Sequence, residues 1–514
     1  MRINWFSVNH PYAQLADAVK QIMALFQVAE NQECHDCIVE NRQDLSPGVV
    51  SVQNRIENDG NICVSTQLLF RSDDGSLQTI YRHASSDCTA ETPQAAANRL
   101  VRLNLLDGMR AITGINPGPW GILRGVRPTK RIHRLLDQGM SLPEIRQQLN
   151  RDYGVDAAKI DLIIDIALRQ NQILSGVDDD DNMISIYIGI PYCPSRCLYC
   201  SFPGSILPEQ EQVETFLRAL EQDMDRAAEI IQRYDLKVQN IYIGGGTPTS
   251  LHSNDFAWLL DSVTERFVTQ DLHEFTVEAG RPDSITDGKI KIMEHYGITR
   301  ISVNPQTMQQ KTLKLIGRMH TVHDIINIFG KIRSSGIPVI NMDIIAGLPG
   351  ETIQDMRNTL EQIYLLGPDN LTVHTLALKK GSALKADSME EHKYFLPDSI
   401  TTAAMLNSAG SLACKMDMQP YYLYRQKYMT GNLENIGYTK PGAACLYNIQ
   451  SMEERQIIIG IGPAAATKAV NRKAGNLTSC YNAKDVTTYI KNLDIYLSRR
   501  QMLVAKLFDD SEEE

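Results

Sequence analysis

Nowhere in its 514 residues does the chain contain an uninterrupted apolar run that is long enough to cross a membrane. Its first residues, Met-Arg-Ile-Asn-Trp-Phe-Ser-Val-Asn-His-Pro, lack the apolar segment of a secretory signal peptide. Ten cysteines do not make a disulfide framework in a chain of this length, and free thiols suit a reducing compartment. These absences predict a cytoplasmic protein with no membrane span.

An excess of positive charge is also absent, because 51 Lys and Arg residues face 61 Asp and Glu residues. The resulting net charge of -10 argues against nonspecific binding to nucleic acid. A composition with 43% hydrophobic and 22% charged residues is ordinary for a globular protein, and the length predicts two or three domains. Acidic stretches at 178–181 and 509–514 indicate an exposed linker and a solvated end.

One short segment, residues 187–202, contains Cys193, Cys197 and Cys200. A strand predicted at 184–190 leads into this Pro-bounded loop, so the three sulfurs can converge on one metal centre. Thiolates suit zinc and iron-sulfur clusters, but structural zinc needs a fourth protein ligand, and no further Cys or His lies nearby. A four-iron cluster with three Cys ligands instead leaves one iron open to a small molecule. The alternative is a zinc knuckle or chance clustering.

Strands and helices alternate after residue 183. Strands are expected at 184–190, 240–244, 273–278, 299–304, 338–345 and 370–376, and helices at about 209–233, 254–268, 286–296, 309–316, 321–335 and 352–366. Six successive β-then-α units predict a parallel sheet covered by helices, and functional residues then gather at the carboxyl ends of its strands.

The residues before the linker predict two further segments. Residues 1–90 are expected to form a small strand-rich unit with strands that include 49–52, 62–70 and 77–81, whereas 91–182 are expected to be helical up to the acidic linker. The expected helices start at Thr92 and then run over about 129–138, 141–153 and 156–174. A loop at 119–130 combines an aromatic residue, glycines and cations, which suits either a carboxylate-binding loop or a tight helix connection.

A glycine-rich turn, Gly244-Gly245-Gly246-Thr247, ends the second strand of the alternating region. Its glycines allow close backbone approach to a small polar group. The turn has neither the lysine of a phosphate-binding loop nor the spacing of a dinucleotide fingerprint, so nucleotide phosphate is disfavoured.

Four polar side chains follow the next strands, and they are Glu278, Gln306, Arg318 and Asp343. A zwitterionic amino acid joined to a ribose needs such partners, because a guanidinium binds its carboxylate and acidic groups bind its hydroxyls. Each residue alone also fits an ordinary cap or surface ion pair. Together they predict a ligand site at one mouth of the sheet.

The cysteine spacing, which ends in an aromatic residue, resembles that of the radical S-adenosylmethionine (SAM) enzymes. The set of motifs from 187 to 468, with the loop at 119–130, resembles the oxygen-independent coproporphyrinogen III oxidase family and its longer branch, the coproporphyrinogen dehydrogenases with an extra N-terminal region. The resemblance implies an α/β fold with a partial six-stranded (β/α)6 barrel at 183–380. A region at 381–514 would close the open side of this barrel.

The resemblance also implies a ligand set. Cys193, Cys197 and Cys200 would hold a 4Fe-4S cluster with SAM on the fourth iron, while Tyr187, Gly245, Gly246, Thr247, Glu278, Gln306, Arg318 and Asp343 would line SAM. A second SAM can lie beside the first. Tyr187 and the three cysteines would be the catalytic residues.

The reaction that the resemblance implies is oxidative decarboxylation of two propionate groups of coproporphyrinogen III, which gives protoporphyrinogen IX. A 5'-deoxyadenosyl radical from SAM would remove a hydrogen atom, and loss of carbon dioxide and one electron would leave a vinyl group. A reduced flavodoxin- or ferredoxin-like protein would supply electrons. Arg425, Lys427 and Lys440 lie in a region rich in tyrosine and would meet the substrate carboxylates, although an aromatic strand packed on the core is the competing interpretation.

Two residues depart from the best-studied branch of the family, which has a cysteine where this chain has Phe202 and a histidine where it has Gly189. The principal alternative function is a haem chaperone, whose relatives carry a His-Asn pair followed by Tyr-Trp. None of the 11 histidines here precedes an asparagine. A radical SAM methyltransferase or a haem-opening enzyme is a third possibility. A second metal site at Cys34 and Cys37 is not expected from a single Cys pair.

Overall fold

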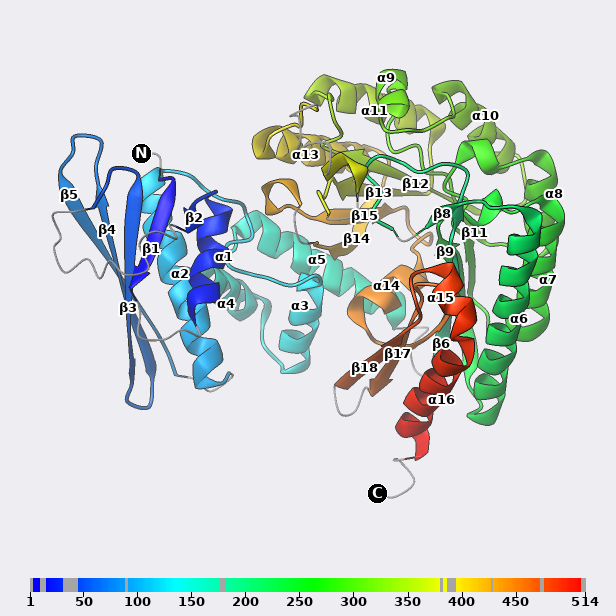
Figure 1. The fold of residues 1–514 in the computed structure, drawn as a ribbon, viewed down its shortest axis with the longest axis horizontal. Coiled ribbons are helices and arrows are strands. Elements are labelled where there is room, and N and C mark those ends of the chain that lie inside the picture. Colours follow the sequence, from blue (N-terminus) through cyan, green and yellow to red (C-terminus); the bar gives the residue numbers. More distant parts are fainter. Residues whose placement is uncertain are drawn as a thin grey trace. The chain divides into compact units, whose positions relative to one another are not determined.

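A computed structural model gives the fold of the chain (Figure 1). It describes residues 3–9, 15–30, 45–87, 91–175, 182–202, 204–379, 382–385, 394–426, 429–471 and 476–509. The chain forms two compact units, one of Met1–Ile164 with Gly431–Leu433 and one of Asp165–Thr430 with Glu434–Glu514. The finer division of the sequence at residues 90, 182 and 380 stays a prediction.

The first unit contains a five-stranded sheet in the order β2-β1-β3-β4-β5. Its strands are β1 (Trp5–Asn9), β2 (Ala29–Glu30), β3 (Val49–Asn58), β4 (Ile62–Arg71) and β5 (Leu77–Ser86). The last three form the antiparallel meander that the sequence predicts. Neither β1 nor the helix α1 (Ala16–Leu25) was predicted, yet both contribute buried residues to the core of this unit.

Helix α2 (Pro93–Thr113) packs on β4 and β5 and completes this core. It begins as predicted, because the Thr92 hydroxyl accepts a hydrogen bond from the Ala95 amide and Pro93 occupies the first helical turn. The predicted helices α3 (Pro128–Asp137), α4 (Leu142–Tyr153) and α5 (Ala157–Leu174) follow.

The loop at 119–130 packs within the first unit. Trp120 in this loop is fully buried, and Gly121 has a φ of +52°. A Cβ atom on Gly121 would lie 2.2 Å from the Tyr153 carbonyl oxygen, so only glycine fits there. These contacts favour the tight helix connection over a carboxylate-binding loop.

The second unit contains an eleven-stranded sheet in the order β14-β15-β13-β12-β11-β10-β9-β6-β16-β17-β18. Its parallel part confirms the predicted strands: β6 (Met183–Ile190), β9 (Lys237–Gly245), β10 (Glu274–Val277), β11 (Arg300–Ser302), β12 (Val339–Ala346) and β13 (Asn370–Thr375). Spatial order follows chain order, as in a partial barrel.

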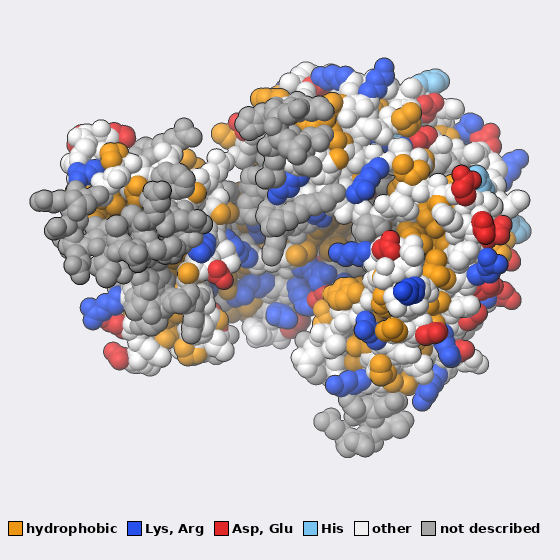
Figure 2. All heavy atoms as spheres, in the orientation of Figure 1, with side chains coloured by type: hydrophobic (Ala, Val, Ile, Leu, Met, Phe, Trp, Pro, Cys, Tyr) orange, Lys and Arg blue, Asp and Glu red, His pale blue; other side chains and the backbone are white. Residues whose placement is uncertain are grey.

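Helices connect these strands, and they match the predicted positions. They are α6 (Gln210–Arg233), α7 (Ser253–Phe267), α8 (Asp287–His295), α9 (Gln310–Leu315), α10 (Val322–Arg333) and α11 (Ile353–Leu366). Lys, Arg, Asp and Glu side chains are interspersed over the helices at the right of Figure 2, as expected for a solvated outer layer. None of the helices within the described ranges is long and apolar enough to cross a membrane. The expected cytoplasmic location stays a prediction.

The C-terminal region extends the sheet at both ends. On one side β15 (Asn435–Thr439) pairs antiparallel with β13, and β14 (Gln419–Tyr424) pairs antiparallel with β15. On the other side β16 (Ile457–Ile461) pairs parallel with β6 and is followed by the antiparallel strands β17 (Ala466–Asn471) and β18 (Asn476–Tyr481). In the described residues this sheet stays open between β14 and β18.

A buried ion pair fastens the last helix, α16 (Leu493–Asp509), to the barrel. Arg500 Nη1 lies 2.5 Å from Asp223 Oδ1 on α6, and both side chains are almost fully buried. The other carboxylate oxygen accepts hydrogen bonds from the Tyr489 hydroxyl and the Gly462 amide. The carboxylate therefore connects α6 with the end of β16, with the short helix α15 (Val486–Lys491) and with α16.

Removal of one partner of this pair leaves an uncompensated buried charge. We expect Arg500→Met to lower the free energy of unfolding by about 3–5 kcal/mol, as measured by urea titration. Arg226→Gln removes an exposed ion pair with Glu229 on α6, the helix that carries Asp223, and is expected to lower the free energy of unfolding by under about 1 kcal/mol. Equal losses in the two variants would contradict the role given to Arg500.

Candidate active site

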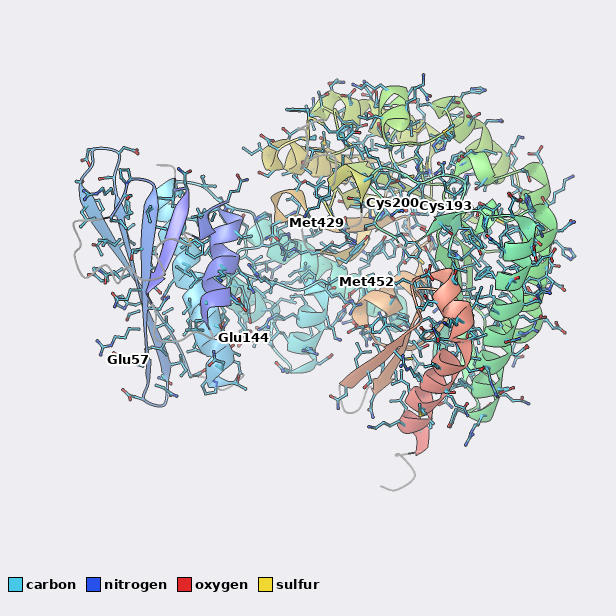
Figure 3. The ribbon with its side chains drawn as sticks, in the orientation of Figure 1. Glu57, Glu144, Cys193, Cys200, Met429 and Met452 are labelled. Carbon is cyan, nitrogen blue, oxygen red and sulfur yellow. The ribbon has the colours of Figure 1, made fainter. Side chains whose placement is uncertain are left out.

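The three cysteines of the sequence motif lie in a loop at the carboxyl end of β6. The loop begins with the two-residue strand β7 (Tyr192–Cys193), which pairs with β8 (Ser205–Ile206), and it is held further by the Leu198 amide, which donates to the Ile316 carbonyl at 3.0 Å. Cys193, Cys197 and Cys200 all line one cavity of about 120 Å³. Figure 3 shows Cys193 and Cys200 near each other at this end of the barrel.

The three sulfurs do not form the close group that a single metal ion would require. Among the described residues, no three Cys, His, Asp or Glu side chains are grouped closely enough to hold a single metal ion. A cluster of four irons spreads its thiolate ligands further apart than one zinc ion does. Burial raises the pKa values of the Cys193 and Cys200 thiols above the ordinary value for cysteine. Both thiols therefore favour the protonated form, and a metal group that binds them would have to displace their protons.

The glycine-rich turn after β9 lies against the start of the cysteine loop. The Gly246 amide donates to the Ile190 carbonyl and the Thr247 amide to the Tyr192 carbonyl, each at 2.7 Å. A Cβ atom on Gly246 would lie 2.5 Å from the Tyr192 oxygen, so the close approach requires glycine. The Thr247 hydroxyl also lies 3.5 Å from the Cys193 sulfur.

The same cavity contains most of the predicted SAM residues. Its lining includes the three cysteines together with Gly245, Gly246, Thr247, Glu278, Gln306 and Arg318. Gln306 has a φ of +67°, an uncommon conformation for a residue other than glycine that often marks a functional site. The sequence motifs on separate strands are therefore brought together as predicted, although their roles stay predictions.

Three buried polar atoms in this cavity lack a hydrogen-bond partner within the described part of the chain. They are Asn304 Oδ1, Gln306 Oε1 and Arg318 Nε. Unsatisfied buried polar atoms are costly, and at a functional site they commonly await a ligand. Two acceptors and one cationic donor beside three sulfurs and a glycine turn fit an amino-acid ligand next to a metal cluster.

Glu278 connects this cavity to a second one, of about 210 Å³, because it lines both. Desolvation of the Glu278 carboxyl group, together with the nearby Asp343 carboxylate, raises its pKa to about 8. Asp343 lines the second cavity and is not among the residues that line the cysteine cavity. Asp343 is therefore a predicted SAM residue that faces the second cavity rather than the cysteine cavity.

The second cavity lies inside the barrel and is rich in tyrosine. It is lined by Tyr242, Thr276, Glu278, Arg300, Ser302, Asn341, Asp343, Thr372, His374, Tyr421, Tyr422, Tyr424, Cys445, Asn448 and Met452. Tyr187 lines neither cavity, but its ring stacks on those of Tyr242 and Tyr447, with 6.2 Å between centroids in each pair. The tyrosines of β14, which the sequence placed in an aromatic strand, both pack in a hydrophobic cluster and line this cavity.

Helix α14 (Leu446–Glu453) covers this second cavity, and Met452 in Figure 3 marks its position. The Glu274 carboxylate holds the first turn of α14, because it accepts the Leu446 amide at 3.0 Å and the Tyr447 amide at 3.3 Å. Arg300 pairs with the same carboxylate at 3.3 Å. Helix α14 of the C-terminal region therefore covers this cavity, whereas closure of the open side of the barrel by residues 381–514, which the resemblance implies, stays a prediction.

A chain of polar contacts crosses the interior from Asp343 to Tyr424. His374 Nε2 lies 3.6 Å from Asp343 Oδ2, and its Nδ1 atom lies 3.1 Å from the Tyr424 hydroxyl. The Asn341 side-chain amide donates to the other Asp343 oxygen at 2.8 Å. The histidine was not singled out in the sequence, where a single His in an apolar strand carries no signal.

The predicted substrate residues do not lie together. Arg425 is buried directly after β14, whose carboxyl end is at the same edge of the sheet as that of β13. Lys440 instead lies at the opposite edge, where its Nζ atom is 3.3 Å from the Gly367 carbonyl oxygen. The structure therefore does not bring Lys440 to the cysteine cavity. Lys427, and also Cys34 and Cys37, lie outside the described residues.

Both departures from the family pattern lie close to the site. Phe202 lines the cysteine cavity. A Cβ atom on Gly189 would lie 2.8 Å from the Pro463 carbonyl oxygen, so the turn after β16 leaves no room for a side chain there. A histidine at position 189 would require that turn to move.

Two residues that line the cavity, Tyr199 and Arg281, were given no role from the sequence. Tyr199, between two of the cysteines, accepts a hydrogen bond from Arg318 Nη2 at 2.8 Å. Arg281 follows β10 and contacts both the Cys197 sulfur and Ser195. The sequence could have indicated Tyr199 as a site residue, because it lies inside the cysteine motif. For Arg281 the only indication was that it follows Glu278 by three residues.

A partial parallel barrel with three cysteines after its first strand defines the radical SAM class, and a family model described as the radical SAM superfamily matches residues 187–363. The oxygen-independent coproporphyrinogen-III oxidase-like protein HemZ from Bacillus subtilis is 41% identical over 80% of this chain and 81% of its own length. The chain belongs to this family of oxygen-independent coproporphyrinogen-III oxidase-like radical SAM proteins. The predicted family, fold class and enzyme class are confirmed.

Two further relatives define the range of this likeness. The heme chaperone HemW from Bacillus subtilis is 30% identical over 56% of this chain and 73% of its own length. The solved structure of coproporphyrinogen III oxidase (HemN) from Escherichia coli, a radical SAM enzyme, is 20% identical, with a TM-score of 0.50 over 63% of this chain and 73% of that chain. Family membership implies a 4Fe-4S cluster and SAM, and the lining of the cavity includes thiols, an arginine and unsatisfied polar atoms that suit such groups.

The cysteine site makes a prediction about iron. We expect anaerobic reconstitution to load about four irons into the chain, and we expect Cys193→Ser, Cys197→Ser or Cys200→Ser to abolish most of this iron. Cys414→Ser, which changes an exposed cysteine on helix α13 (Ser399–Lys415), is the matched control and should retain it. Iron analysis and the visible absorbance of the cluster measure the result. Zinc in the wild-type site would contradict the prediction.

The raised pKa of Glu278 makes a prediction about pH. Between the ordinary value of 4.5 and about 8, the folded chain keeps a proton that the unfolded chain has lost, so stability falls as pH rises. Glu278→Gln cannot ionise and removes this dependence. We therefore expect the stability of the metal-free variant, relative to metal-free wild type, to increase across this window in urea titrations. Parallel pH profiles for the two chains would contradict the assignment.

Proposed function

We propose that this chain converts coproporphyrinogen III to protoporphyrinogen IX by oxygen-independent oxidative decarboxylation of two propionate groups. The proposal is supported by the cysteine cavity and by the likeness to a coproporphyrinogen-III oxidase-like relative over most of the chain. The single observation that carries it is the position of Glu278, which lines both the cysteine cavity and the tyrosine-rich interior cavity. Ligands in the two cavities would therefore meet at this residue.

The cysteine cavity suits the cofactors. Cys193, Cys197 and Cys200 would hold the cluster, and Gln306 and Arg318 would bind polar groups of SAM with their unsatisfied buried atoms. Together these cofactors supply, when bound, a carbon radical that can remove a hydrogen atom from a propionate side chain. The proposal includes a second SAM molecule beside the first.

The interior cavity suits an electron-rich macrocycle that carries carboxylates. Its tyrosine rings offer flat apolar surfaces, and Tyr422 and Tyr424 stack nearly parallel at 6.3 Å. His374 on β13 lines this cavity, and Arg425 directly follows β14 at the same edge of the sheet. Their N–H groups would donate hydrogen bonds to the propionate carboxylates. Lys440 has no part in this proposal, because it lies at the opposite edge.

The protein's own contribution is to orient the reacting groups and exclude water. Helix α14 covers the interior, and the Glu274 contacts hold it in place. Glu278, with its pKa raised to about 8, would be largely protonated near neutral pH and so add no negative charge beside an anionic substrate. A reduced flavodoxin- or ferredoxin-like protein remains the proposed electron donor.

The test is an anaerobic assay with the reconstituted chain, SAM, a chemical reductant and coproporphyrinogen III. We expect 5'-deoxyadenosine to form, and we expect mass spectrometry to show porphyrin products that have lost carbon dioxide and two hydrogen atoms once and then twice. Cys197→Ser should give neither product, whereas Cys414→Ser should behave as wild type.

A haem chaperone is the competing function, because HemW proteins also match this chain. It predicts stoichiometric haem binding and transfer without decarboxylation. The same preparation can be titrated with haem and followed by its Soret absorbance. Tight haem binding together with an unchanged porphyrinogen pool would reject the proposed reaction in favour of the chaperone.

A further inference from the structure

One arginine contacts a sulfur of the candidate cluster site directly. Arg281 Nη1 lies 3.5 Å from the Cys197 sulfur and 3.3 Å from the Ser195 carbonyl oxygen, and Nη2 donates to the Ser195 hydroxyl at 2.8 Å. Only 3% of the arginine side chain is exposed. The guanidinium therefore holds the cysteine loop through contacts with Ser195 and Cys197.

Other groups fix the orientation of this guanidinium. The Asp283 carboxylate accepts hydrogen bonds from Nε and Nη2, each at 3.0 Å, in the two-point geometry typical of strong Arg–carboxylate pairs. His320, which is also buried, places Nδ1 3.3 Å from the same carboxylate. Arg281 itself caps the short helix η4 (Pro282–Ser284) that follows β10, so its backbone is held as well.

The other arginine of the cavity is bound differently. Arg318 donates to the Tyr199 hydroxyl and to the carbonyls of Gly280 and Asn304, and no hydrogen bond from it to a sulfur is found among the described residues. The Thr247 hydroxyl contacts Cys193 but carries no charge. Arg281 thus places a positively charged N–H donor beside a cysteine sulfur, in a buried position where solvent screens its charge little and the Asp283 carboxylate on its far side offsets that charge in part.

We propose that Arg281 is a positioning residue that holds Cys197 in place and raises the reduction potential of the cluster. A reduced cluster carries one more negative charge than an oxidised one, so a nearby cation with an N–H···S hydrogen bond stabilises the reduced form more. This inference rests on the proposed cluster but not on the porphyrinogen substrate, because the potential is a property of the loaded protein without substrate.

The test is a redox titration of the reconstituted full chain without SAM, followed by electron paramagnetic resonance. In Arg281→Gln we expect the midpoint potential to become more negative. At a fixed potential the ratio of oxidised to reduced cluster should rise about tenfold, which corresponds to about 59 mV for a one-electron couple. Arg281→Lys keeps the charge but not the planar fork, and we expect a smaller shift in the same direction.

Two controls separate this effect from general damage. Arg333→Gln breaks an Arg–carboxylate pair with Asp369 at the opposite edge of the sheet and should leave the potential unchanged. Asp283→Asn keeps Arg281 but removes the carboxylate that offsets its charge, so a shift to a more positive potential, opposite in sign to that of Arg281→Gln, is expected.

The outcomes distinguish the two proposals. Arg281→Gln with four irons and the wild-type potential would overturn the role of Arg281. If Arg281→Gln does not load iron, the Arg281→Lys variant decides the question. A wild-type potential in Arg281→Lys, or its failure to load iron, would show that Arg281 has only a structural role. A wild-type chain without a cluster would reject the proposed cofactor itself, whereas failure to convert porphyrinogen with a normal cluster would reject only the proposed reaction.

Discussion

The parallel pairing of β6 with β9 is the constraint on which the whole site depends. Its register places Ile190 opposite Gly245, and the ladder continues past the strand ends through the hydrogen bonds that Gly246 and Thr247 donate to the cysteine loop. The backbone contact is so close that side chains larger than glycine cannot enter the turn. Backbone hydrogen bonds to Ile190 and Tyr192 therefore hold the chain just before the first cysteine, and the Thr247 hydroxyl adds a contact to its sulfur.

The remaining strands add their functional groups to this fixed edge in chain order. The segments that follow β6, β10 and β11 contribute the cysteines, Glu278 and Gln306, which line one cavity although 113 positions separate Cys193 from Gln306 in the sequence. The same arrangement explains the unsatisfied buried polar atoms. The side chains of Asn304, Gln306 and Arg318 lie in the cavity, and each has one polar atom without a hydrogen-bond partner among the described residues. A parallel barrel tolerates such unsatisfied groups where a ligand can complete them.

The alternating half of the fold could be predicted from the sequence because each strand there is a short apolar run between helical periodicities. The unit at the N-terminus was harder. β1 pairs in parallel with β3 across more than 40 residues, and such nonlocal pairing leaves no periodic signal beyond a few apolar residues. Lys440 shows a second limit, because composition placed it near the substrate whereas the antiparallel direction of β15 carries its end to the other edge of the sheet.

Contacts that depend on side-chain direction were beyond the sequence, and Arg281 is the clearest case. Its neighbours in the chain suggest only a turn after a strand, but the turn geometry of η4 points the guanidinium back toward Cys197 and Ser195. A lysine could reach the same sulfur, yet only a planar fork can bind the Asp283 carboxylate at two points while it still donates to the cysteine loop. The barrel therefore places a guanidinium beside a cysteine sulfur from the turn after β10, whereas the cysteine loop itself follows β6.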